Sequence, residues 1–251
     1  MKLNFWKKQN NNNIVHWAYD EHRLRGFQGL GLCMFEPVPV LSHYYKNTEA
    51  YLLSCPAFRA SLQNTYVILS PIDIRIRYSR SDKQNKKMEI EIPELVPELQ
   101  KTLLLPRFND TGKQGNEVFS ITFTPYLFYC DHSMIMEILP PFLEWNNRNN
   151  ARIICGSYDI GKWKRPIEYA VELKDTDGIF EIKRGEPLLY VRFNLASPTT
   201  RVYLKPTIMT EALIKEMSVN VNLKRILPNQ TLESCYALRE SYNKLFKNFM
   251  S

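Results

Sequence analysis

The chain has 251 residues, of which 44% are hydrophobic and 12% aromatic, which is enough to bury a sizeable core. Its formal net charge of +7 at pH 7 indicates an anionic partner only weakly, because the basic residues are scattered. No apolar run reaches the length of a membrane-spanning helix, so no membrane span is expected.

The N-terminus and the cysteines favour a location inside a cell. The first residues, MKLNFWKKQNNNN, lack the apolar segment of a signal peptide, so we do not expect secretion by that route. Cysteines stand at positions 33, 55, 130, 155 and 235, an odd number at wide spacing and in apolar surroundings. This pattern predicts buried, reduced thiols in a cytosolic compartment.

The first quarter of the chain predicts short elements. Residues 1–8 are compatible with an edge strand. Residues 14–40 predict a helical or irregular turn and then a strand, which is interrupted by glycines and ends at Pro37 and Pro39. Pro56 is a favourable first residue for a short amphipathic helix over residues 57–64.

A hairpin is predicted for residues 72–78 and 88–92. Apolar residues alternate with charged ones in both segments, as in strands with one buried face. If residue 78 pairs with residue 88, Arg77 faces Glu89 and Arg75 faces Glu91 on the exposed side.

More strands are expected further along the chain. Residues 93–116 indicate a long loop, and strands are predicted at 118–124, 127–130, 134–139 and 152–155. The segment 165–194 contains three alternating runs separated by turn residues, which predicts a meander of three consecutive strands at the centre of the core.

The C-terminal part of the sequence predicts two helices. Thr207 is the expected N-cap of the first and Thr231 of the second. In the second helix, spacings of three and four residues form one apolar stripe of Cys235, Leu238, Tyr242, Leu245 and Phe249. Such a stripe packs on the protein's own sheet or forms an oligomer contact, and for the contact we single out Leu238, Tyr242, Leu245 and Phe249.

Together these elements predict a mainly β (α+β) fold. We expect an antiparallel, jelly-roll-like β-sandwich over residues 1–205, with a helical extension over residues 206–251 packed on it.

No sequence motif identifies a catalytic, cofactor or metal site. None of the four histidines, at positions 16, 22, 43 and 132, has a carboxylate two residues later, as the iron-binding facial triad requires. Nucleophile-elbow, phosphate-loop, dinucleotide-binding and Cys-x-x-Cys motifs are also missing from the sequence. His16 with Asp20, and Cys130 with His132, are weak pairs for which structural roles are the simpler interpretation.

One basic region is compatible with nucleic-acid binding. Arg80, Lys83, Lys86 and Lys87 cluster near the hairpin loop, and Trp163 stands between lysines, where an exposed ring could stack on a base. The alternative is a solvated surface that keeps the protein soluble, because the predicted register pairs Glu89 and Glu91 with two nearby arginines, Arg77 and Arg75.

Three segments carry a resemblance to a known family. They are LLSCPAF at 52–58, NTYVILSPIDIRI at 64–76 and RGEPLLYVRF at 184–193. In this order they resemble an uncharacterised family found mainly in tailed phages of marine bacteria. The resemblance implies a phage origin and a location in the host cytoplasm or the virion. The family has no assigned activity, so it implies no catalytic residue.

Two functions of different classes are therefore expected. The first is a non-enzymatic structural or adaptor protein with a protein partner or a homo-oligomer. The alternative is a small-ligand or metal-dependent enzyme that uses the sandwich interior. This alternative predicts a deep cavity in which two or more residues of one set converge: His16, His22, His43, His132, Asp20 and Asp131.

Overall fold

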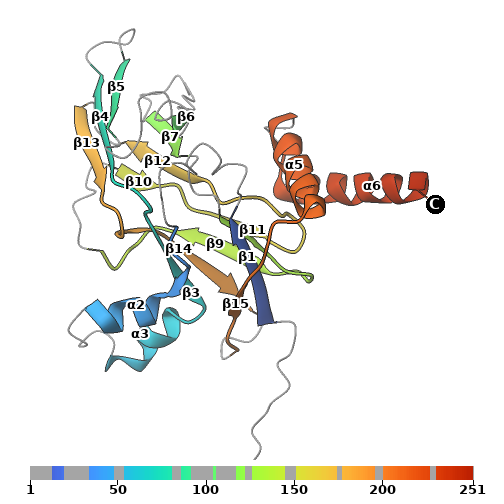
Figure 1. Cartoon of the computed structure of the whole chain (residues 1–251), viewed down its shortest axis with the longest axis horizontal. Coiled ribbons are helices and arrows are strands. Elements are labelled where there is room, and N and C mark those ends of the chain that lie inside the picture. The colour runs from blue at the N-terminus through green and yellow to red at the C-terminus, as the bar shows by residue number, and fades with distance from the viewer. Residues whose placement is uncertain are drawn as a thin grey trace, which may run out of the picture.

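The computed structural model describes residues 13–19, 34–47, 54–80, 86–91, 104–105, 117–121, 126–144, 151–173, 177–195, 200–226 and 230–250. Over these residues the protein is mostly β, with several antiparallel sheets and a few helices (Figure 1). No helix in this described part is long and apolar enough to cross a membrane.

The largest described sheet has five strands. Its order is β11 (Gly156–Asp159), β9 (Ile135–Leu139), β14 (Pro187–Asn194), β3 (Thr65–Leu69) and β2 (Val38–Pro39). The first five residues of β14 are buried, as a central strand covered on both faces requires.

Three smaller sheets are also described. One has the order β15 (Tyr203–Pro206), β1 (Ile14–Tyr19) and β8 (Tyr126–Tyr129), and in it β1 and β15 run parallel. The second has the order β10 (Ala151–Ile153), β12 (Tyr169–Leu173), β7 (Glu117–Ile121) and β6 (Leu104–Leu105). The third has the order β13 (Asp177–Ile182), β4 (Ile74–Arg80) and β5 (Lys86–Glu91).

All four sheets contribute to one hydrophobic core. Trp17, Val191, Tyr169 and Phe180, one from each sheet, belong to the same cluster of buried side chains. Burial of these large apolar groups is the main term that favours the folded state. The coarse prediction of a β-rich, sandwich-like protein is confirmed.

Helices lie at two places on this β body (Figure 1). The short helices α2 (Val40–Asn47) and α3 (Pro56–Ser61) lie together beside β3. A second cluster of buried side chains, which includes Val40, Leu62 and Tyr190, fixes them there. The helices α5 (Glu211–Ile226) and α6 (Leu232–Met250) lie elsewhere on the body, and α6 extends away from the sheets.

The predicted hairpin is confirmed down to its register. Tyr78 pairs with Met88, which sets Arg77 opposite Glu89 and Arg75 opposite Glu91. The start of α3 at Pro56 and the cap of α6 at Thr231 are also confirmed, since the amide of Ser234 donates to the Thr231 hydroxyl at 3.2 Å.

The predicted meander is wrong. Its three strands exist as β12, β13 and β14, but each belongs to a different sheet. β14 pairs with β3 and β9, and β13 pairs with β4. Alternation identifies a strand and its buried face, but it does not identify the partner strand.

The predicted cap of α5 is also wrong. The helix begins after Thr210, whose hydroxyl accepts a hydrogen bond from the amide of Leu213 at 3.3 Å. Thr207 instead donates its amide to the carbonyl of Trp17 at 2.9 Å, which extends the pairing of β15 with β1 past Pro206. The helix α2 was not predicted, and the edge strand at 1–8 lies outside the described residues.

The prediction of buried cysteines is confirmed for two of the four described cysteines and is wrong for the other two. Cys130 and Cys235 are buried, whereas Cys55 and Cys155 are free and exposed. Cys55 caps the surface helix α3, and Cys155 follows β10 in an exposed connection, so local hydrophobicity was a poor guide to burial at both positions. Cys33 lies outside the described residues.

Candidate functional site

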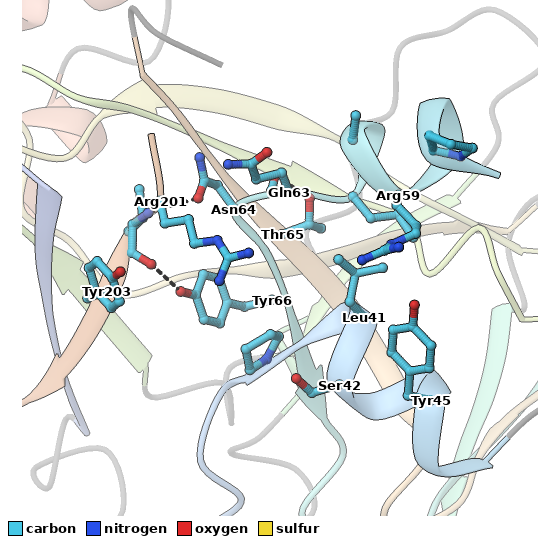
Figure 2. A pocket seen from close by; sticks show the side chains of 15 residues that line it. Leu41, Ser42, Tyr45, Arg59, Gln63, Asn64, Thr65, Tyr66, Arg201 and Tyr203 are labelled. Atoms are coloured by element: carbon cyan, nitrogen blue, oxygen red, sulfur yellow. Dashed lines mark hydrogen bonds between the residues drawn. The ribbon is translucent and has the colours of Figure 1, made fainter. Parts of the chain in front are cut away.

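A surface groove lies between the α2–α3 pair and the beginning of β15 (Figure 2). Its volume is about 570 Å³, which falls within the usual range of small-ligand sites. Side chains from α2, α3, β3 and the segment Arg201–Tyr203 line it. Segments that are far apart in the sequence therefore build this groove together.

The turn from α3 into β3 forms one wall of the groove. Leu62 caps α3, and Asn64 adopts a left-handed backbone conformation with φ of 59° just before β3 begins. Asparagine is one of the few residues with a side chain that adopts this conformation at little cost. Asn64 therefore allows the chain to reverse direction beside the groove.

The side chain of Asn64 also fixes the opposite wall. Its amide nitrogen donates to the carbonyl of Thr200 at 2.9 Å, and its amide oxygen accepts from the amide of Val202 at 2.8 Å. The hydroxyl of Tyr66 donates to the carbonyl of Val202 at 2.7 Å (Figure 2). Arg201 stands between two residues whose backbone is held in this way.

Burial raises the pKa of Tyr66 to about 12, with a smaller contribution from Tyr203. The Tyr66 phenol therefore keeps its proton at neutral pH and remains a hydrogen-bond donor to Val202. The contact that supports the groove wall does not depend on pH in the physiological range.

Arg59 and Arg201 give the groove a positive charge. No residue among the described groove lining carries a carboxylate, and within the described chain neither arginine has an ion-pair partner. In Figure 2 the two guanidinium groups enter from opposite sides and turn toward the centre of the groove. This arrangement suits an anionic ligand.

The sequence did not reveal this groove. Arg59 and Arg201 are far apart in the chain, and neither belongs to a recognisable motif. The only local signal was Asn64 directly before the apolar run of β3, which is compatible with a left-handed turn but does not indicate a ligand.

The first two turns of α6 attach it to the body. Cys235 is buried, and the hydroxyl of Tyr236 accepts a hydrogen bond from the amide of Asp159 at 2.8 Å. The ring of Tyr236 also packs on Trp163, with ring centroids 6.1 Å apart.

Glu216 of α5 adds an ionic contact to this attachment. One carboxylate oxygen lies 3.5 Å from the guanidinium of Arg239 in α6, and the other lies 3.1 Å from the ammonium of Lys164. The α5 residue Asn220 donates to the carbonyl of Lys164 at 2.9 Å. Both helices are thus held on the segment before Pro166.

Beyond these turns, α6 carries exposed apolar side chains. Leu238 is 42% exposed and Tyr242 is 39% exposed. Tyr242 follows Cys235 by seven residues, or two helical turns, so both residues lie on the same face of α6. Leu245 and Phe249 lie in α6 as predicted, but their side chains fall outside the described residues.

The predicted nucleic-acid contact is only partly described. Arg80 pairs with Lys86 and Ser79 with Lys87 at the tip of the hairpin, while Lys83 lies outside the described residues. The expectation of an exposed Trp163 is wrong, because this side chain is 2% exposed. Its amide donates to the carbonyl of Asp159 at 2.8 Å, and the resulting turn directs the indole into the core.

The histidines do not form a described cluster. His16 stacks on Tyr129, while His43 contacts Tyr44, and burial lowers the pKa of His43. The thiol of Cys130 donates to the carbonyl of His132 at 3.0 Å, and burial raises the pKa of that thiol to about 11. Asp20 and His22 lie outside the described residues.

Asp159 lies near Cys130 and His132 but has a structural role. Its carboxylate accepts hydrogen bonds from the hydroxyl of Ser133 at 2.6 Å and from the amides of Met134 and Gly161 at 3.1 and 2.9 Å. Within the described ranges, no three residues of the types His, Cys, Asp and Glu form a group that could hold a metal ion.

Comparison with protein-family models, with curated proteins and with solved structures finds no match.

Proposed function

We propose that this protein is a non-enzymatic structural or adaptor protein, and that it assembles with a second copy of itself through α6. The observation that carries the proposal is the course of α6, which leaves the body with Leu238 and Tyr242 exposed. Exposed apolar groups in a continuous stripe are typical of contact surfaces.

The distribution of charge on α6 supports a second copy as the partner. Glu233 and Glu240 lie on the face opposite Leu238 and Tyr242, given the helical spacing. Near a two-fold axis, a residue of one chain lies close to the same residue of the other chain. A charged residue there would therefore repel its equivalent in the second chain. The guanidinium of Arg239 lies 6.0 Å from the centroid of the Tyr242 ring, but the Arg239 side chain is buried. The exposed charges of Glu233 and Glu240 lie away from the contact face, which limits the repulsion expected between two chains that each carry +7.

The phage origin and a location in the host cytoplasm or the virion belong to the same proposal and rest on the sequence resemblance. A jelly-roll arrangement of the sheets is also part of it. The predominance of antiparallel pairing and the single core shared by all four sheets support that arrangement.

Small-ligand binding is the second candidate function, and the groove beside Asn64 favours it. This groove differs from the expected location in the sandwich interior, because α2, α3 and β15 form it at the surface.

The assembly proposal is tested with a double variant, Leu238→Ser with Tyr242→Ser, in the full chain. In a two-fold contact each substitution acts twice, so we expect the self-association constant to fall by about 100-fold or more. Sedimentation velocity across a range of protein concentrations measures this change.

The matched control changes the opposite face of α6, as Ala237→Ser with Glu240→Gln. Both of these residues are exposed, and association should be unchanged. Far-ultraviolet circular dichroism of each variant checks that the fold is retained. If the Leu238/Tyr242 variant associates as the unmodified chain does, the contact does not involve this face of α6.

A further inference from the structure

We propose that the groove beside Asn64 binds a phosphorylated small molecule of the nucleotide class, held by Arg59 and Arg201. This inference goes beyond assembly through α6 and does not depend on it, because the groove and the exposed face of α6 are formed by different elements.

The charge of the groove selects an anion. Arg59 extends from the last turn of α3 and Arg201 from the segment before β15, and both side chains turn toward the centre of the groove. Guanidinium groups bind phosphate oxygens through paired hydrogen bonds, in a geometry that a lysine ammonium does not offer. With no carboxylate in the described lining, no protein group competes for these donors.

The backbone that carries Arg201 is held in place before any ligand arrives. The residues on either side of it are fixed by the hydrogen bonds that Asn64 and Tyr66 make to the backbone of Thr200 and Val202. A fixed backbone lowers the conformational entropy that is lost when the arginine binds a phosphate. These contacts distinguish Arg201 from an arginine on a free surface loop.

Aromatic rings in the groove favour a nucleotide over a bare phosphate. Tyr45 and Tyr203 line the groove and are each 49% exposed, so part of each ring is accessible to a ligand. Tyrosine rings stack on nucleobases with little dependence on which base is present. The cavity volume of about 570 Å³ is also larger than an isolated phosphate needs.

Isothermal titration calorimetry of the full chain tests the proposal with three probes. ADP carries both phosphates and a base, pyrophosphate carries only the phosphates, and adenosine carries only the base. We expect ADP to bind most tightly, pyrophosphate more weakly, and adenosine without measurable heat. If ADP does not bind at millimolar concentration, or if adenosine binds as tightly as ADP, the proposal is overturned.

Charge-matched variants separate a built site from general attraction to a basic protein. The variant Arg59→Gln with Arg201→Gln should bind ADP at least about tenfold more weakly. The control, Lys183→Gln with Lys205→Gln, removes the same charge from exposed residues outside the groove and should change ADP affinity less than about twofold. Equal losses in both variants would contradict a site at the groove.

A further variant, Asn64→Gly, tests how Arg201 is positioned. Glycine adopts the same left-handed backbone but removes the amide that holds Thr200 and Val202. ADP affinity should fall severalfold in the unmodified background and should not fall further when Arg201→Gln is already present. An equal loss in both backgrounds would show that Asn64 does not act through Arg201. Leu238→Ser with Tyr242→Ser should leave ADP binding unchanged.

Discussion

Two residues without charge have specific structural roles near the two proposed surfaces. Asn64 fixes the backbone on either side of Arg201 through its side-chain amide. Gly161 allows the turn that carries Asp159 to pack against the backbone of His132. Since the amide of Asp159 donates to Tyr236, the attachment of α6 depends on that turn.

Gly161 provides a sharp test of this close packing. A Cβ atom added to Gly161 would lie 2.0 Å from the carbonyl oxygen of His132, so Gly161→Ala forces backbone atoms to move. We expect the substitution to lower the free energy of unfolding by about 2–3 kcal/mol. Urea denaturation followed by circular dichroism measures the change.

Gly156 supplies the matched control. A Cβ atom at Gly156 has no heavy atom within 4 Å, so Gly156→Ala should change the free energy of unfolding by less than about 0.5 kcal/mol. Equal effects of the two substitutions would show that the approach of Gly161 to His132 is not a tight contact in the native state.

At the scale of single residues, sequence reasoning succeeded where the signal was local. Pro56 and Thr231 were predicted as helix starts because their effects act on the next few residues. The groove was not predicted, because Arg59 and Arg201 meet only after distant segments pack together. The burial of Trp163 was missed for the same reason, since its neighbour Tyr236 comes from α6.

At the scale of elements, one carboxylate that contacts two cations contributes to the attachment of α6. Glu216 lies between Arg239 and Lys164, and Arg239 is itself buried. A buried guanidinium that loses its carboxylate partner pays a desolvation cost that is no longer offset.

The variant Glu216→Gln should therefore destabilise the protein by about 1–3 kcal/mol, the lower end reflecting the partial exposure of Glu216 and Lys164. It should also make α6 more accessible to limited proteolysis. Glu240→Gln, at an exposed position in α6, is the control and should have neither effect. If Glu216→Gln behaves like this control, the ionic contacts do not hold α6 in place.

The alternation of apolar and polar residues predicted the strands better than it predicted their pairing. The hairpin of β4 and β5 was predicted with its register because its strands are neighbours in the sequence and carry complementary charges. The strands β12, β13 and β14 were placed correctly but assigned the wrong partners, because none of them pairs with the next strand along the chain. Burial patterns fix which face is inside, and only the packed fold decides which strands meet.

At the scale of the whole molecule, the protein carries two surfaces with different chemistry. The groove presents positive charge beside exposed tyrosines, and α6 presents apolar side chains away from the sheets. This separation lets assembly and ligand binding be tested independently. The Leu238/Tyr242 variant changes only α6, and the Arg59/Arg201 variant changes only the groove.

The most direct test of the central claim is the molar mass of the unmodified chain in solution. Size-exclusion chromatography with light scattering, repeated over a dilution series, should show a mass that rises with concentration toward twice 29.6 kDa. A mass of 29.6 kDa at every concentration up to the millimolar range would contradict self-association through α6.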